Sequence, residues 1–262
     1  MDENSAFEKK GIAVMQNNQV KTFENDFDAS LDMFAAAAAA DERTGFIMKT
    51  YLYLFGAIAA LITIEVFYFM VLGIERMAGV TQAMLVNGSV SWLIVLGAFM
   101  LVSWLANSWA MNATSSAIQH AGLALYIAAM SVLLIPLLCL AYLAAGDAKI
   151  ITSAATATAG LFALLTLTVF ITRKDFSFLR SILVFGGLAA LGLIITAILF
   201  QFSLGPVFIY AMIALMCGYI LFDTSNILHH YRIGQHVAAS LALFASVVML
   251  FWYILQLFLS RE

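Results

Sequence analysis

Hydrophobic and polar positions divide the chain into a polar N-terminal stretch and a long apolar remainder. Seven apolar runs follow one another, at residues 46–73, 91–109, 117–144, 150–172, 178–202, 206–228 and 236–259. A helix needs about twenty apolar residues to cross a hydrocarbon core of roughly 30 Å, and each run is about that long or longer. None shows the alternation of a barrel strand. The pattern therefore predicts an all-α integral membrane protein, a bundle of seven transmembrane helices.

The connections between the runs are short and contain residues typical of turns. They include Asn87-Gly88, Gly146-Asp147, Gly205-Pro206 and Gly234. Short connections predict that neighbouring helices are antiparallel and adjacent. The chain has only two prolines and no long polar linker between the runs, so residues 46–262 are expected to form one membrane domain.

Residues 1–45 are predicted to be an acidic, flexible, cytoplasmic tail. They contain nine of the fifteen acids and four of the twelve bases, a balance of −5 that leaves +2 for the rest of the chain. The alanines at 35–40 favour a helical stub leading into the first span, since alanine has the highest helix propensity. A flexible tail is also a possible binding segment for a partner protein. The opening MDENSAFEKK is not typical of a cleavable signal peptide.

The composition agrees with a membrane protein: 64% of the residues are hydrophobic and 10% are charged. Soluble domains have about 25% charged residues. Cys139 and Cys217 lie within apolar runs and are interpreted as small hydrophobic residues, with no CxxC pair. The chain offers no basic surface for nucleic acid, no phosphate-binding glycine loop and no motif for a cofactor.

Catalytic and metal-binding patterns are also weak. The loop after the sixth run contains His229, His230, Arg232 and His236. Three histidines allow a zinc hypothesis, but HExxH is absent and all three lie around one loop, so a positively charged loop is the favoured interpretation. His120, in the third run, is interpreted as a hydrogen-bonded residue of the bundle. Since GxSxG is also absent, we do not expect an enzyme.

Two carboxylic acids lie well inside the predicted spans, where a charge costs roughly 2.5–3.5 kcal/mol. Asp223 shares a helix face with Tyr219 and Asn226, four residues before it and three after it. The functional hypothesis is a protonatable group that faces the bundle interior or an aqueous cavity. The alternative is a neutral acid whose hydrogen bonds join two helices. Glu65, in the first run, has only Thr63 as a nearby polar residue, and its role is left open.

Several segments resemble one known family. The first, residues 172–179, contains the charged loop motif Arg173-Lys174-Asp175. The second comprises residues 218–227 and continues through residues 241–257 of the last run. Together with Lys49-Thr50-Tyr51, these segments resemble the Bax inhibitor-1 family, also called the transmembrane Bax inhibitor motif family. The bacterial YccA-like branch is the most similar.

The resemblance covers roughly residues 43–260 and implies a seven-helix bundle with a cytoplasmic N-terminus. It also implies that some members are pH-sensitive calcium leak pathways, gated by an aspartate pair on the last two helices. Asp223 matches the first aspartate, whereas the second position corresponds to Ser246. A serine cannot share a proton with Asp223 as a second carboxylate would. The YccA-like branch also lacks the second acid, and its members are associated with the membrane AAA protease FtsH as substrates and modulators.

The leading hypothesis is therefore a multi-pass protein of the bacterial inner membrane that binds and inhibits an FtsH-type protease. The alternative is a pH-sensitive leak of calcium ions or protons that uses Asp223. A third hypothesis, a zinc-dependent membrane hydrolase, is the least supported.

The first prediction concerns topology. Lysines and arginines accumulate on the cytoplasmic side of membrane proteins. With a cytoplasmic N-terminus, the inner side has six cations (Arg43, Lys49, Arg173, Lys174, Arg180 and Arg232) and the outer side has three (Arg76, Lys149 and Arg261). We therefore expect the N-terminus inside and the C-terminus outside. Reporter fusions at both ends measure this directly, and the same reporter state at Asp2 and Glu262 would contradict it.

Overall fold

The computed structural model describes residues 40–85, 89–112 and 115–261. Within these ranges, seven helices are long and apolar enough to cross a membrane, which confirms the predicted fold class. The N-terminal residues 1–34, the alanines at 35–39 and the predicted turn Asn87-Gly88 lie outside the described residues.

The seven spans match the predicted runs closely. They are α2 with η1 (Ala40–Phe67 and Tyr68–Leu72), α4 (Ser89–Ala110), α5 (Ser116–Ala145), α6 (Lys149–Thr172), α7 (Leu179–Phe200), α8 (Gly205–His229) and α9 (His236–Leu259). The ends agree to within two residues, with one exception. Helix α2 already begins at Ala40, six residues before the predicted start of the membrane domain.

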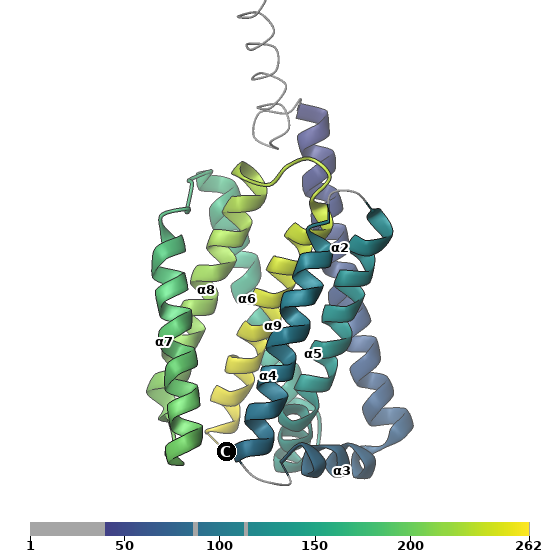
Figure 1. Ribbon diagram of the computed structural model, residues 1–262, viewed down its shortest axis with the longest axis vertical. Helices are drawn as coiled ribbons and strands as arrows, with labels where there is room; N and C mark the ends of the chain where they lie inside the picture. The colour runs from purple at the N-terminus through teal and green to yellow at the C-terminus, as the bar shows by residue number, and fades with distance from the viewer. Residues whose placement is uncertain (1–39, 86–88, 113–114, 262) are drawn as a thin grey trace, which may run out of the picture.

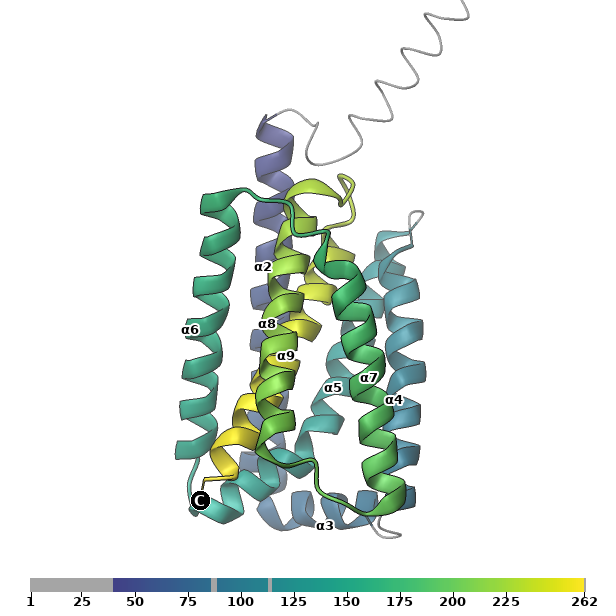
Figure 2. The ribbon, with the colours of Figure 1, turned by 90° about the vertical axis from the view of Figure 1, so that its left-hand side faces the viewer.

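The last helix, α9, occupies the centre of the bundle. It packs against α8, α2, α6, α5 and α4, and it lies between the other spans in both side views (Figures 1 and 2). Most of its length is buried, whereas α4 and α7 expose most of theirs. In a membrane, the outer helices would therefore separate most of α9 from the lipid.

One helix was not predicted: α3 (Ile74–Leu85) lies across one end of the bundle instead of crossing it (Figures 1 and 2). It follows the π-helical turn η1, and Gly73 changes the chain direction with a φ of 86°, a conformation that glycine adopts without strain. Helix α3 contacts α5 and buries Met77. The prediction of a short connection here was therefore wrong, because twelve amphipathic residues are too few to span and pack along the end instead.

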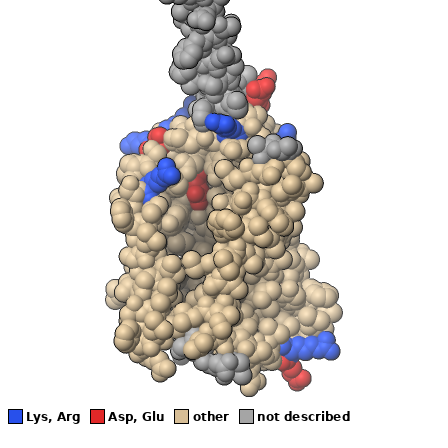
Figure 3. Space-filling view, in the orientation of Figure 1, with Lys and Arg blue, Asp and Glu red and all other residues tan. Residues whose placement is uncertain are grey.

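The two ends of the bundle differ in charge. The N-terminal end of α2 lies at one end and the C-terminus at the other (Figure 1). On the face shown in Figure 3, lysines and arginines gather mainly at the end where α2 begins. We call this the basic end; the connections α6–α7 and α8–α9 are also there. Seven spans, an odd number, thus separate the start of α2 from the end of α9, which lie at opposite ends of the bundle.

Helices α4 and α5 approach each other closely at Gly122. A Cβ atom placed on Gly122 would lie 2.5 Å from the carbonyl oxygen of Ala106 and 2.7 Å from the amide nitrogen of Ala110. Ala106 and Ala110 are themselves fully buried. Small residues let transmembrane helices pack backbone to backbone, and this contact has that form.

We therefore expect Gly122→Ala to destabilise the bundle. Both clashing atoms belong to the backbone, so the helices must separate, and overpacking of this kind costs about 1–3 kcal/mol. The measurement is the thermal unfolding midpoint in detergent. Gly97→Ala on α4 is the matched control, because a Cβ there meets no atom within 4 Å. Equal midpoints for the two variants would show that the close contact is not required.

Candidate functional site

The candidate site is a buried acid–hydroxyl pair between the last two helices. The Ser246 hydroxyl on α9 donates a hydrogen bond of 2.6 Å to Oδ2 of Asp223 on α8. Asp223 is 8% exposed and Ser246 is 7% exposed. Ser246, which the resemblance matched to the second position of the pair, therefore does lie next to Asp223. The distance lies within the range of about 2.5–3.0 Å of O–H···O hydrogen bonds.

Two other predicted residues, Tyr219 and Asn226, make their hydrogen bonds with groups other than the Asp223 carboxylate. Tyr219, one turn before Asp223, donates its hydroxyl to the carbonyl oxygen of Leu183 on α7, at 3.0 Å. Asn226 accepts the backbone amides of His230 and Tyr231 with its backbone carbonyl, where α8 ends. The predicted helix face is thus present, but its members bind different neighbours.

The charged loop motif is attached to the same part of α8. The loop between α6 and α7 contains Arg173, Lys174 and Asp175, and Arg173 ends α6 in the left-handed conformation, with a φ of 49°. The Phe176 amide in this loop donates a hydrogen bond of 2.9 Å to the hydroxyl of Ser225. Ser225 lies two residues after Asp223, so the loop is anchored beside the buried acid.

Asp175 and His230 add a second contact to this attachment, which is an ion pair when His230 is protonated. Nε2 of His230 lies 3.5 Å from Oδ2 of Asp175, and both side chains are about half exposed. Partial desolvation raises the pKa of Asp175, but the backbone and hydroxyl of Ser177 and the charges of His230 and His229 outweigh it, so the pKa is below its usual value. Asp175 is therefore an anion at neutral pH.

A polar cluster that the sequence did not reveal joins three spans near the basic end. The Tyr53 hydroxyl of α2 lies 2.7 Å from Nε2 of His120 on α5. The Tyr53 ring also packs against His236 of α9, with ring centroids 5.1 Å apart. His120 is thus a hydrogen-bonded residue of the bundle, as interpreted. Residues 53, 120 and 236 lie on separate runs, and no spacing in the sequence relates them.

Glu65 is not part of the Asp223 pair. It is 9% exposed, and neither of its carboxylate oxygens has a hydrogen-bond partner within the described structure. It lies on α2, three residues before the π-helical turn Tyr68–Leu72. Its position confirms that it is a buried acid, without assigning it a role.

No group of three histidine, cysteine, aspartate or glutamate side chains within the described ranges could hold a metal ion. What the site offers is a titratable group that connects two helices. Asp223 lies six residues before the end of α8, about 9 Å along a helix, so the group is close to the basic end.

Comparisons with known proteins agree with this architecture. A family profile described as "Inhibitor of apoptosis-promoting Bax1" matches residues 43–262. The chain is 38% identical over 116 residues to "Bax inhibitor 1" of Schizosaccharomyces pombe, covering 42% of each chain. It is 34% identical over 121 residues to "Protein LIFEGUARD 4" of Arabidopsis thaliana, covering 44% of this chain and 48% of the relative.

A bacterial relative, an uncharacterized protein of Pseudomonas aeruginosa, is 32% identical over 116 residues, which cover 42% of this chain and 50% of the relative. The chain thus spans about half or less of these curated relatives. No solved structure matches significantly. Because the family profile covers nearly the whole membrane domain, the chain belongs to the Bax inhibitor-1 family.

Proposed function

We propose that this protein is a leak pathway for calcium ions or protons, controlled by the protonation of Asp223. The observation that carries the proposal is the buried hydrogen bond from Ser246 to Asp223. Ionisable side chains are costly in hydrocarbon and therefore rare there. Those found inside a bundle are commonly part of an ion path. Family membership supports the same conclusion.

The proposed switch is the strength of the bond between α8 and α9. An ionised Asp223 accepts a charge-assisted hydrogen bond from Ser246, which is roughly twice as strong as a neutral one. Protonation of Asp223 weakens this bond and lets α8 move relative to the central helix. The bond is present when Asp223 is ionised and weakens as the pH falls, so the leak increases as the pH falls.

Variants of the pair test this switch. Asp223→Asn keeps the size but removes the titrating group, so we expect a leak that stays high and no longer depends on pH. Ser246→Ala should raise the leak near neutral pH roughly tenfold or more, because hydrogen bonds to charged groups contribute about 1.5–3 kcal/mol. Calcium and proton fluxes into proteoliposomes between acidic and mildly alkaline pH provide the measurement.

Two control variants distinguish the loss of the Asp223–Ser246 pair from a general destabilisation of the bundle. Ser240→Ala changes another buried serine of α9, whose hydroxyl donates only within its own helix, to the carbonyl of Val237 at 2.8 Å. Asp147→Asn removes an exposed acid at the opposite end. Both should leave the leak unchanged. A leak whose pH dependence survives in Asp223→Asn, or the absence of flux of either ion, would rule out the switch.

A second candidate function is modulation of an FtsH-type membrane protease. The supporting observation is that α2 begins at the basic end of the bundle. The excess of lysine and arginine favours a cytoplasmic location for that end. The acidic residues 1–39 precede α2 in the sequence and would then be in the cytoplasm.

A processive AAA protease needs a flexible segment to grip, and seven spans embedded in lipid are hard to extract. A slowly extracted substrate would occupy the protease and inhibit it.

Deletion of residues 1–34 tests this second function. We expect the bundle to stay folded, its turnover by FtsH to slow, and its inhibition of other substrates to increase. A pulse-chase experiment measures the lifetimes of the full-length and shortened proteins beside a second FtsH substrate. Replacing residues 1–34 with a glycine–serine segment of the same length is the matched control, and it should restore turnover. Equal lifetimes for all three proteins would refute the role of the tail.

A further inference from the structure

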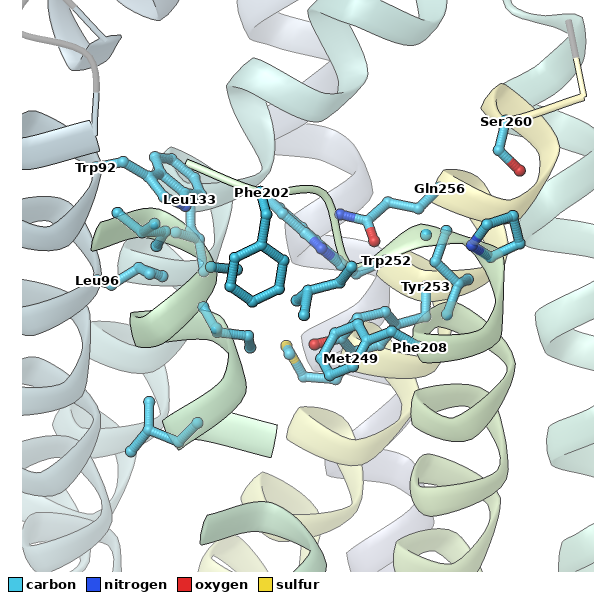
Figure 4. Close-up of a pocket in the computed structure, with 18 of the residues that line it drawn as sticks. Trp92, Leu96, Leu133, Phe202, Phe208, Met249, Trp252, Tyr253, Gln256 and Ser260 are labelled. Atoms are coloured by element: carbon cyan, nitrogen blue, oxygen red, sulfur yellow. The ribbon is translucent and has the colours of Figure 1, made fainter. Parts of the chain in front are cut away.

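A cavity of the described structure lies between spans, in the half of the bundle away from the basic end. It has a volume of about 570 Å³ and is lined by α4, α7, α8, α9 and the α7–α8 connection (Figure 4). Small-molecule sites have volumes of roughly 300–1,000 Å³. The surface is hollowed between α4 and α7 on this side (Figure 3), so the cavity opens towards the surrounding bilayer.

The lining is apolar and largely aromatic. Trp92 of α4 stacks on Trp252 of α9 with ring centroids 6.5 Å apart. Phe208 of α8 packs edge-on against Tyr253 at 6.4 Å. The α7 side contributes Ala197, and Phe202 comes from the connection. Such a surface offers dispersion contacts to hydrocarbon but no charge or metal ligand.

The packing of α7 leaves this space unfilled by protein. The main contacts of α7 are with α8 and α4, whereas α9 contacts most of the other spans. A gap between helices forfeits the van der Waals contacts that hold a membrane bundle together. Because the gap opens to the bilayer, hydrocarbon chains are the molecules available to fill it.

Polar groups lie at one end of the cavity, near the ends of the helices. Gln256 of α9 and Ser260, which follows that helix, line it, and the Gln256 amide points into it (Figure 4). The next residue, Arg261, donates a hydrogen bond of 3.3 Å to the hydroxyl of Tyr210 on α8. An arginine guanidinium has five N–H donors and suits a phosphate group. The cavity itself thus has an apolar body and a hydrogen-bonding end, and Arg261, outside its lining, directly follows that end in the chain.

We propose that this cavity binds one phospholipid, with an acyl chain between α7 and α9 and the phosphate at Arg261. From Met249 to Ser260, the α9 side of the cavity is about 16 Å long, close to half of a hydrocarbon core of roughly 30 Å. The cavity therefore matches one leaflet in depth. The lipid completes the packing between α7 and the central helix.

Photo-crosslinking in proteoliposomes tests the proposal. The full chain is reconstituted in phosphatidylcholine vesicles that contain a phosphatidylglycerol with a photoreactive group in its acyl chain. We expect crosslinks at cavity residues such as Met249 and Phe202. Ala197→Phe places a ring in the cavity and should reduce these crosslinks by about tenfold. Ala189→Phe, at an exposed position of the same helix, is the matched control and should not change them.

Two further measurements do not depend on the folding of Ala197→Phe. In the wild-type protein, crosslinks in the cavity should saturate as the photoreactive lipid increases, whereas crosslinks at the exposed Phe185 should rise in proportion. Arg261→Gln should reduce cavity crosslinks of phosphatidylglycerol but leave those of a diacylglycerol with the same chain unchanged. Proportional labelling at both places, or equal labelling of both lipids by the wild-type protein, would overturn the proposal.

Discussion

The architecture depends on the burial of α9 in the middle of the bundle. In lipid, every helix can be apolar all round, so the hydrophobic effect does not select which span lies inside. What distinguishes an inner span is that its polar side chains can find protein partners. Helix α9 has two buried serines, and one of them, Ser246, donates to the acid of α8. The polar pair can be tolerated at that depth because other helices surround it.

The C-terminal end of α8, where Asp223 lies, also binds a loop. In the last turns of α8, Ser225 accepts a hydrogen bond from the loop between α6 and α7. The contact between Asp175 and His230 joins the same loop to the end of α8. The low pKa of Asp175 keeps its charge at neutral pH. The loop motif and Asp223 are therefore attached to the same end of α8.

The sequence predicted the seven spans and their ends because twenty apolar residues leave a helix few alternatives in lipid. It could not predict which span is central: α7 is the most apolar of the seven and lies outside, whereas α9 is less apolar and is buried. Helix α3 was missed because a twelve-residue amphipathic segment is too short to stand out beside the spans. The partner of Asp223 could be located only by resemblance, and the contact between Tyr53 and His120 depends on packing that no single helix encodes.

The acid pair and the outer cavity lie on the same two helices. Asp223 and Ser246 connect α8 and α9 near the basic end, while Phe208 and Tyr253 line the cavity near the opposite end. A movement of α8 against α9 would change the hydrogen bond and the shape of the cavity together. If a lipid binds one arrangement of the helices more tightly, thermodynamic linkage requires protonation of Asp223 to change the affinity for that lipid by the same factor as the lipid changes the proton affinity. The bilayer and the pH would then act on one helix contact from its two ends.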